Sequence, residues 1–296
     1  MDVVTGAFSF TGRYVAARLL DSGREVRTLT RRPQSESPFG DRVRAFPLDF
    51  ADPGPLRGAD TLYNTYWIRF PDGETSFEDA VANTVALFGA ARAAGVRRVV
   101  QLSVAHASPD SPYAYFRGKA AVEAALASSG LSHAIVRPTL VFGDGEVLVN
   151  NIARLLRRSP LFVLPRAASR IRPIAAEDLA DLCVEAALGE DDVTFDAAGP
   201  EELAFEQLVR TVREAVGSRA VLLRGGPRTV LALTRGLGVL ARQTLLTSDE
   251  LGALADDLLT SAEPPRGTRR FAAWVQGSAP GLGRRLATGD RRPWPK

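Results

Sequence analysis

Two hydrophobic patterns alternate along the first 140 residues of the chain. Short continuous apolar runs predict buried strands, and longer stretches with apolar residues every three or four positions predict helices. The predicted strands are residues 2–5, 25–30, 43–47, 61–64, 98–103 and 132–137. The predicted helices are residues 12–22, 77–94 and 113–129, and the second of these has Ser76 as its N-cap and ends at Gly95.

The alternation of strands and helices predicts the α/β fold class, a doubly wound Rossmann parallel sheet with helices on both faces. We assign residues 1–140 to this cofactor-binding unit. The alternation then becomes less regular, so residues 141–262 are predicted to form a smaller, mostly helical C-terminal substrate lobe, followed by a tail at 263–296. The lobe is predicted to contain helices at 146–157, 177–188, 205–216, 227–240 and 249–258, and short strands at 161–164, 170–174 and 193–196.

The turn after the first strand has the features of a phosphate-binding turn. It follows a strand and opens a helix, where free N–H groups and the helix dipole stabilise a pyrophosphate. Gly6 permits a tight turn and Gly12 permits close packing of helix on strand, but Ser9 replaces a usual glycine, so a structural turn without a ligand remains an alternative. The residues predicted to contact a dinucleotide here are Gly6, Phe8, Ser9, Phe10, Thr11 and Gly12.

The end of the second predicted strand favours one dinucleotide over the other. An acidic residue at this place bonds the ribose hydroxyls in many NAD sites. This chain has Arg31 and Arg32 instead, and two guanidinium groups suit a 2′-phosphate. We therefore predict NADP as the cofactor, with NAD as the alternative, while two solvated surface arginines are the non-functional interpretation.

Three residues near the fifth predicted strand suit proton transfer. Ser103 ends that strand, and Tyr115 and Lys119 are four residues apart, so they share a face if they lie on a helix. A neighbouring ammonium lowers the pKa of a phenol, which lets a tyrosine act as acid and base. Tyr113 is a rival for Tyr115, but its partner four residues on is Arg117, which does not titrate.

Lysine usage strengthens the assignment of Lys119. All but two of the 37 basic residues are arginine, and the other lysine is the C-terminal Lys296. We predict Ser103, Tyr115 and Lys119 as catalytic residues, with Lys119 also bonding the cofactor ribose. A strand-end cap for Ser103 and a solvated helix position for Lys119 are the structural alternatives.

The segment after the fourth predicted strand is expected to line the ligand crevice, because strand carboxyl ends face it in a doubly wound sheet. Asn64, Thr65 and Tyr66 are predicted to contact the cofactor. Trp67 and Arg69 are predicted to contact the substrate, together with Ser103 and Tyr115, although packing and surface charge explain the first two equally well.

Composition and charge narrow the classes of function. The net charge is +3 with acidic and basic residues intermixed, which argues against nucleic-acid binding. One cysteine, Cys183, and two histidines, His106 and His133, give no basis for a disulfide or a metal site. We find no signal peptide and no transmembrane segment, because the apolar stretch at 229–240 is short and holds Arg235, so we expect a cytoplasmic protein. Nothing in the sequence predicts an oligomer or excludes one.

These residues resemble the extended and atypical short-chain dehydrogenase/reductase superfamily. The resemblance covers roughly residues 1–186 and is nearest to the NAD-dependent epimerase/dehydratase-like proteins, with similarity to the NmrA-like and complex I NDUFA-type members. It implies that Asp49 and Phe50 lie at the adenine and that Asn83 is structural. It also implies that Pro138, within residues 137–143, lies beside the nicotinamide, and that residues 172–180 return the chain toward the substrate lobe.

Two hypotheses for the function follow. The first is an oxidoreductase or epimerase that uses Tyr115, Lys119 and Ser103 on a small carbonyl or alcohol substrate. The second is a dinucleotide-binding regulatory or assembly protein without turnover, as many atypical members are. The tyrosine–lysine pair favours the first hypothesis, and Phe8 and Ser9 in the turn favour the second.

Overall fold

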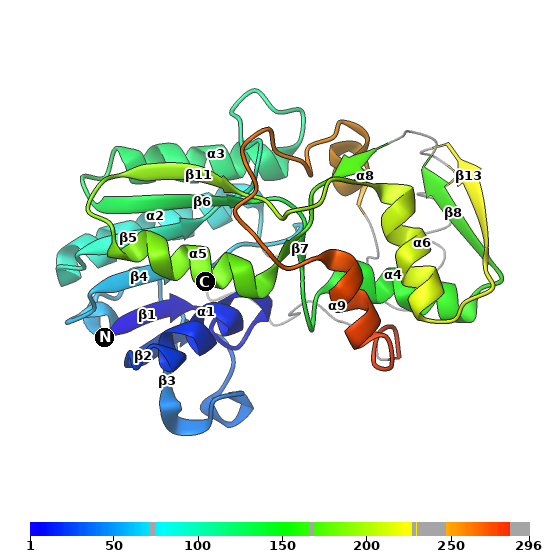
Figure 1. The fold of residues 1–296 in the computed structure, drawn as a ribbon. Helices are drawn as coiled ribbons and strands as arrows, with labels where there is room; N and C mark the ends of the chain where they lie inside the picture. The colour runs from blue at the N-terminus through cyan, green and yellow to red at the C-terminus, as the bar shows by residue number, and fades with distance from the viewer. Residues whose placement is uncertain (72–74, 166–168, 227–228, 230–246, 285–296) are drawn as a thin grey trace. The chain divides into compact units, whose positions relative to one another are not determined.

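A computed structural model describes the chain except for residues 72–74, 166–168, 227–228, 230–246 and 285–296 (Figure 1). Its contacts divide the described residues into two units. The first comprises residues 1–138 and 176–197, and the second comprises 139–175 and 198–284. The first boundary lies close to the predicted one at residue 140, but residues 176–197 belong to the first unit rather than to the predicted lobe.

The first unit contains one seven-stranded sheet in the order β11-β6-β5-β4-β1-β2-β3. All of its neighbouring strands are parallel, which confirms the predicted doubly wound sheet. The strands are β1 Asp2–Thr5, β2 Val26–Thr30, β3 Val43–Pro47, β4 Thr61–Asn64, β5 Arg98–Leu102, β6 Ser132–Pro138 and β11 Val193–Ala197. The order reverses between β1 and β4, where ligands bind in sheets of this kind.

Two pairs of helices cover the sheet of the first unit, with α1 packed beside α5 and α2 beside α3 (Figure 1). The helices are α1 Phe10–Asp21, α2 Phe77–Ala94, α3 Ala114–Ala127 and α5 Ala176–Leu188, with short 3₁₀ turns at Gln34–Glu36, Gly40–Arg42 and Gly54–Leu56. Helix α2 has the predicted limits because Ser76 and Asp79 form a reciprocal capping box and Gly95 adopts a left-handed conformation.

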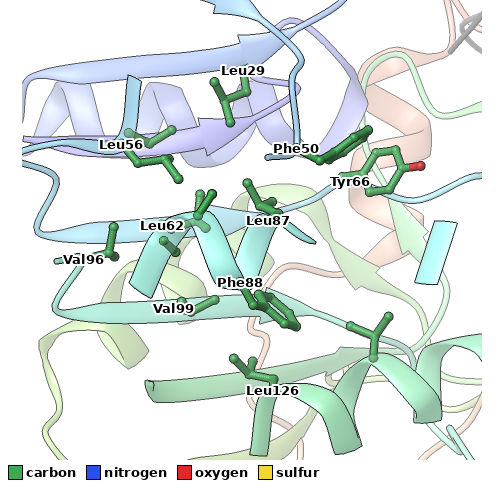
Figure 2. Close-up of a cluster of buried hydrophobic side chains, with 14 of the residues drawn as sticks. Leu29, Phe50, Leu56, Leu62, Tyr66, Leu87, Phe88, Val96, Val99 and Leu126 are labelled. Atoms are coloured by element: carbon green, nitrogen blue, oxygen red, sulfur yellow. The ribbon is translucent and has the colours of Figure 1, made fainter. Parts of the chain in front are cut away.

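One hydrophobic core of the first unit lies between the sheet and helices α2 and α3 (Figure 2). Leu62 on β4, Val99 on β5 and Leu87 on α2 are fully buried in it. Strands that are covered on both faces consist mostly of apolar residues, which explains the continuous apolar runs in the sequence.

A charged residue, Arg98, is fully buried in this unit. The Arg98 side chain, at the start of β5, has no exposed surface. Its Nε donates to the carbonyl of Ala186 at 3.0 Å and its Nη2 to the carbonyl of Asp191 at 2.7 Å, while Nη1 donates to Ser132 Oγ at 2.6 Å. Desolvation lowers the pKa of this guanidinium. Arg98 thus connects the end of α5 to the sheet.

The second unit has short strand pairs and helices around its own core. Its elements are β7 Val141–Phe142, α4 Val147–Arg158, β8 Leu161–Pro165, β9 Arg170–Ile171, β10 Ile174–Ala175, β12 Leu203–Ala204, α6 Phe205–Ala215, β13 Val221–Gly225, α8 Ser248–Ala255 and α9 Phe271–Ser278. The pairs are β7 with β10, β8 with β13, and β9 with β12. Phe142, Phe271 and Trp274 form an aromatic group in the core, with ring centroids 5.3–6.1 Å apart.

The C-terminal part differs from the prediction in two places, and a third prediction lies mostly outside the described residues. The predicted strand at 170–174 is two strands, because Arg172 and Pro173 interrupt it. The tail assigned to 263–296 contains helix α9, which the sequence pattern did not predict. The predicted helix at 227–240 lies almost wholly outside the described residues.

The structure bears on two further expectations. None of the helices in the described part of the chain is long and apolar enough to span a membrane. Cys183 is buried in α5 as expected, and desolvation raises the pKa of its thiol to about 12.

Candidate dinucleotide and acid–base site

The turn between β1 and α1 depends on both of its glycines. Gly6 has a φ of 65°, which favours glycine. A Cβ atom on Gly12 would lie 2.3 Å from the carbonyl oxygen of Gly6. Helix α1 therefore packs directly on the turn, and any side chain at position 12 would separate them.

The first turn of α1 leaves backbone donors available. Ser9 is the N-cap, but its hydroxyl donates to the Gly6 carbonyl at 2.6 Å and makes no bond to the helix. Within the described residues, the N–H groups of Phe10, Thr11 and Gly12 donate to no acceptor. Such donors at a helix N-terminus suit a pyrophosphate.

The aromatic side chains of this turn pack against neighbouring residues of the protein. Phe8 is buried, and Phe10 packs edge-on against Tyr14, with ring centroids 5.8 Å apart. Thr11 is half-buried. These predicted cofactor residues are placed at the turn, where the N–H groups of Phe10 and Thr11 are the atoms suited to a ligand.

Arg31 and Arg32 directly follow β2, as the sequence predicts. Both side chains are half-buried, and the backbone N–H of Arg32 donates to Thr30 Oγ1 at 3.1 Å. In this fold, residues at the carboxyl end of β2 lie at the ribose that carries the 2′-hydroxyl of NAD or the 2′-phosphate of NADP.

The residues after β3 make a hydrogen bond and a ring contact that stabilise the loop they form. Asp49 is exposed, and its Oδ1 accepts from the backbone N–H of Ala51 at 2.9 Å. Phe50 is buried against Tyr66, with ring centroids 4.6 Å apart (Figure 2). Asn83 Nδ2 donates to the Tyr66 hydroxyl at 3.2 Å, so Asn83 supports that ring.

A chain of buried hydrogen bonds crosses the sheet at its carboxyl edge. The Thr5 hydroxyl donates to Asn64 Oδ1 at 2.9 Å, and Asn64 Nδ2 donates to Gln101 Oε1 at 2.8 Å. Gln101 Nε2 then donates to the Leu102 carbonyl at 2.8 Å, which also accepts from Lys119 Nζ at 2.9 Å. This chain connects the end of β1, beside the glycine turn, to the predicted catalytic lysine.

Thr65 and Tyr66 attach the end of β4 to β1. The N–H of Thr65 donates to Thr5 Oγ1 at 2.8 Å, and its hydroxyl donates to the Thr5 carbonyl at 2.6 Å. The N–H of Tyr66 donates to the same Thr5 hydroxyl at 3.0 Å. Both residues are thus bound to the end of β1, next to the glycine turn, and their contact with the cofactor stays a prediction.

The predicted acid–base residues gather at this same edge. Lys119 Nζ lies 4.6 Å from the centre of the Trp67 ring, and the Tyr115 ring packs edge-on against that ring at 6.1 Å. Ser103 follows Leu102 and is 4% exposed, and its Oγ bonds to no group in the described part of the chain. Tyr115 and Lys119 thus both contact the Trp67 ring, and Ser103 follows the residue whose carbonyl binds Lys119.

The environment of Lys119 changes its ionisation. The side chain is 3% exposed, and burial lowers the pKa of the amine to about 7. The negative charge of Glu123 opposes part of this decrease. Glu123 is itself paired with Arg137, whose Nη2 lies 2.5 Å from its Oε2.

Two predicted residues are less closely tied to this cluster. Pro138 ends β6, and its carbonyl accepts from the N–H of Ala105 at 2.9 Å, just after Ser103. The Arg69 guanidinium lies 5.8 Å from the ring centre of Phe70. No group of metal-ligating side chains occurs among the described residues.

Gln101 and Glu123 are parts of the site that the sequence analysis missed. Gln101 is the one uncharged polar residue in the buried strand Arg98–Leu102, and a polar residue near the end of a buried strand is a usable signal. Glu123 follows Lys119 by four residues, so helical spacing already places it beside the amine.

Comparison with known proteins finds one family model that matches more than half of the chain. Residues 6–190 match the model of the NAD(P)H-binding family. The chain is 30% identical over 277 residues to the (4-alkanoyl-5-oxo-2,5-dihydrofuran-3-yl)methyl phosphate reductase of Streptomyces griseus, covering 90% of this chain and 87% of that protein. It is 26% identical over 286 residues to NADH dehydrogenase (ubiquinone) 1 alpha subcomplex subunit 9, mitochondrial, of Arabidopsis thaliana, covering 87% and 70%.

Solved structures share the fold at low sequence identity. The triphenylmethane reductase of Citrobacter sp., complexed with NADP(H), aligns with a TM-score of 0.76 and 18% identity over 94% of this chain and 99% of that chain. A nucleoside-diphosphate-sugar epimerase of Staphylococcus aureus aligns with a TM-score of 0.72 and 17% identity over 93% and 100%. Reductases and epimerases thus both occur among proteins of this fold.

Proposed function

Because this chain belongs to the NAD(P)H-binding family, we propose that it is an NADP-dependent oxidoreductase that acts on a small carbonyl or alcohol. The observation that carries the proposal is the gathering of Tyr115, Lys119 and Ser103 at the sheet edge that holds the glycine turn. The relatives include both reductases and a respiratory-complex subunit, so family membership by itself does not select the activity.

The glycine turn fits a dinucleotide. Position 12 has no room for a side chain, and the N–H groups at the start of α1 have no acceptor among the described residues. In the proposal, Phe10, Thr11 and Gly12 donate to the pyrophosphate, and Lys119 donates to the ribose beside the nicotinamide. The bound nicotinamide supplies or accepts the hydride.

The protein groups then manage the proton that accompanies the hydride. In the reducing direction, the Tyr115 hydroxyl donates its proton to the substrate oxygen as the carbonyl becomes an alcohol. The Ser103 hydroxyl, which has no partner in the described residues, donates a hydrogen bond to the same oxygen. A positive charge on Lys119 favours the tyrosinate that remains. Oxidation of an alcohol reverses these steps.

The first experiment tests dinucleotide binding at the turn. We expect Ser9→Asp to raise the Kd of NADPH by roughly tenfold or more, because the new carboxylate repels the pyrophosphate and accepts from the same N–H groups. Aspartate cannot donate the bond that the Ser9 hydroxyl makes to the Gly6 carbonyl, but it can accept from the free N–H groups of α1 as an N-cap, so the thermal stability of the protein should change little. Fluorescence titration measures the Kd, and circular dichroism measures stability.

Ser129→Asp is the charge-matched control for this experiment, because Ser129 lies beyond the C-terminal end of α3, at the opposite edge of the sheet. It should bind NADPH as the unmodified protein does. Equal NADPH affinity in Ser9→Asp and the unmodified protein would remove the turn from the proposed site.

The choice of NADP over NAD rests on Arg31 and Arg32. A charge-assisted hydrogen bond contributes about 1.5–3 kcal/mol, so Arg31→Ala combined with Arg32→Ala should weaken NADPH binding by roughly tenfold or more. The Kd of NADH should change little, because NADH lacks the 2′-phosphate. Arg57→Ala, which removes an exposed arginine of the same unit, is the control. A protein that binds NADH as tightly as NADPH from the start would refute this selectivity.

The second candidate function is a dinucleotide-binding assembly or regulatory protein without turnover. The similarity to a mitochondrial NADH dehydrogenase subunit favours it, as do Phe8 and Ser9 in the turn. Tight NADPH binding without NADPH consumption across a panel of carbonyl substrates would support this function over the first.

A further inference from the structure

Trp67 lies at the centre of the acid–base cluster, although the sequence suggests only a substrate contact for it. Its ring stacks on Phe77, with centroids 6.1 Å apart and planes inclined by 16°. The Tyr115 ring meets it at 90°, and Lys119 Nζ lies over its face at 4.6 Å. The indole therefore contacts both members of the tyrosine–lysine pair.

The indole rests on a part of α3 that has no side chain. A Cβ atom on Gly118 would lie 3.0 Å from Cη2 and from Cζ2 of Trp67, which is tighter than ordinary van der Waals contact. Glycine inside a helix costs about 1 kcal/mol relative to alanine. The gap that Gly118 leaves lets the ring approach the helix next to Lys119.

These contacts determine which directions remain open around Lys119. An ammonium has three N–H donors. One donates to the Leu102 carbonyl, and the Trp67 face covers a second direction. No other acceptor for Nζ is found in the described residues, so the third N–H has no protein partner there.

We infer that Trp67 is a positioning residue for Lys119, whose indole keeps water from the amine and holds Nζ beside the Leu102 carbonyl with one donor direction left for a ligand. The inference rests on the proposed function only for the identity of that ligand, which would be the ribose of the dinucleotide. The contacts of Trp67 with Lys119 hold whether or not the protein turns over a substrate.

The charges around Lys119 support a role for water exclusion. Glu123 on the same helix favours the ammonium, but Arg137 on β6 pairs with Glu123 and offsets that charge. Tyr115 is the other titratable group on this face of α3. Leu102, Ser103 and Trp67, which approach from the strand ends, do not titrate near neutral pH. The indole face attracts the ammonium and by itself would raise the pKa of Lys119, but desolvation is the largest cause of the lowered pKa. We therefore expect the admission of water to outweigh the lost attraction, so that removal of the cover raises that pKa.

The rarity of lysine allows a direct measurement. Protein labelled with ¹³C at lysine Cε gives two lysine signals, from Lys119 and Lys296, and a Lys296→Arg variant assigns them. In the unmodified protein, Lys119 should titrate near 7. In Trp67→Ala, water reaches the amine, and the pKa of Lys119 should rise by about one unit or more toward the ordinary value near 10.4. Trp67→Phe keeps an aromatic cover and should give a smaller rise.

Gly118→Ala tests the same contact without removing the indole. Its methyl group pushes Trp67 away from α3, so the pKa of Lys119 should rise here as well, even if Trp67→Ala does not fold. Gly89→Ala in α2 is the matched control, because a Cβ atom there meets nothing within 4 Å. That control should leave the Lys119 titration unchanged.

An unchanged Lys119 titration in both Trp67→Ala and Gly118→Ala would overturn the inference. A merely structural role for Trp67 would lower stability in these variants and leave the lysine signal where it was. The measurement needs no dinucleotide, so the absence of NADPH binding would refute the proposed function without touching this result.

Discussion

Replacing Tyr115 by phenylalanine is expected to lower kcat for carbonyl reduction by roughly 100- to 10,000-fold, the usual contribution of a general acid. The change removes one hydroxyl and keeps the ring, which packs against Trp67, Phe77 and Phe116. The Kd of NADPH and the thermal stability should therefore change little. Stopped-flow or steady-state loss of NADPH absorbance measures kcat once a substrate is found in a carbonyl panel.

Tyr113→Phe is the matched control for this prediction. Tyr113 precedes α3 by one residue and is the other tyrosine of the segment. The same loss of a hydroxyl should leave kcat almost unaffected there. If Tyr115→Phe and the unmodified protein reduce the substrate at the same rate, Tyr115 is not the acid, and if Tyr113→Phe alone is inactive, the roles are exchanged.

Replacing Arg98 by methionine is expected to lower the free energy of unfolding by about 3 kcal/mol, because the hydrogen bonds of its charged guanidinium are lost. The carbonyls of Ala186 and Asp191 would lose their charged donor. Methionine has a similar length, so packing alone would not explain such a loss. Urea denaturation followed by circular dichroism measures it, and a decrease in Tm on the order of 10 °C should accompany it.

The adjacent Arg97 provides the comparison. Its side chain is 44% exposed and pairs with Asp60, with a further bond to the Ala187 carbonyl at 2.8 Å. Exposed ion pairs contribute little, so Arg97→Met should cost about 1 kcal/mol or less. Equal losses in the two variants would show that burial of Arg98 is not what makes its hydrogen bonds important.

The sequence predicted six strands of the sheet because they are mostly apolar and their turns are marked by glycine and serine, but it assigned β11 to the C-terminal lobe. Helix α2 has its predicted limits because the signals at Ser76 and Gly95 are local. Helix α9 was missed because its apolar residues pack against Phe142, which lies more than 100 residues earlier in the chain, and a local pattern does not reveal such a contact. Likewise, local pattern does not show that Arg98 is buried, since its partners come from α5 and the residues after it.

The parts of the site that lie within one turn or helix were accessible from sequence. The glycine turn and the spacing of Tyr115 and Lys119 are of this kind, because each is defined by residues that are close together in the sequence. The contact of Gln101 with Asn64 depends on the register of β4 and β5, in which these two residues are direct partners. The contact of Trp67 with Lys119 depends on the path of the loop after β4, which no periodicity determines.

The hydrogen bonds of the Asn64 and Gln101 side-chain amides all run in one direction, which limits the residues that these two positions can accept. Each amide accepts on the side of Thr5 and donates on the side of the Leu102 carbonyl. Aspartate at position 64 would face Gln101 with an acceptor, and rotation of the Gln101 amide would only move the clash to Leu102. A single exchange of this kind would leave two acceptors facing each other, so we expect compatible sequences to change both positions together.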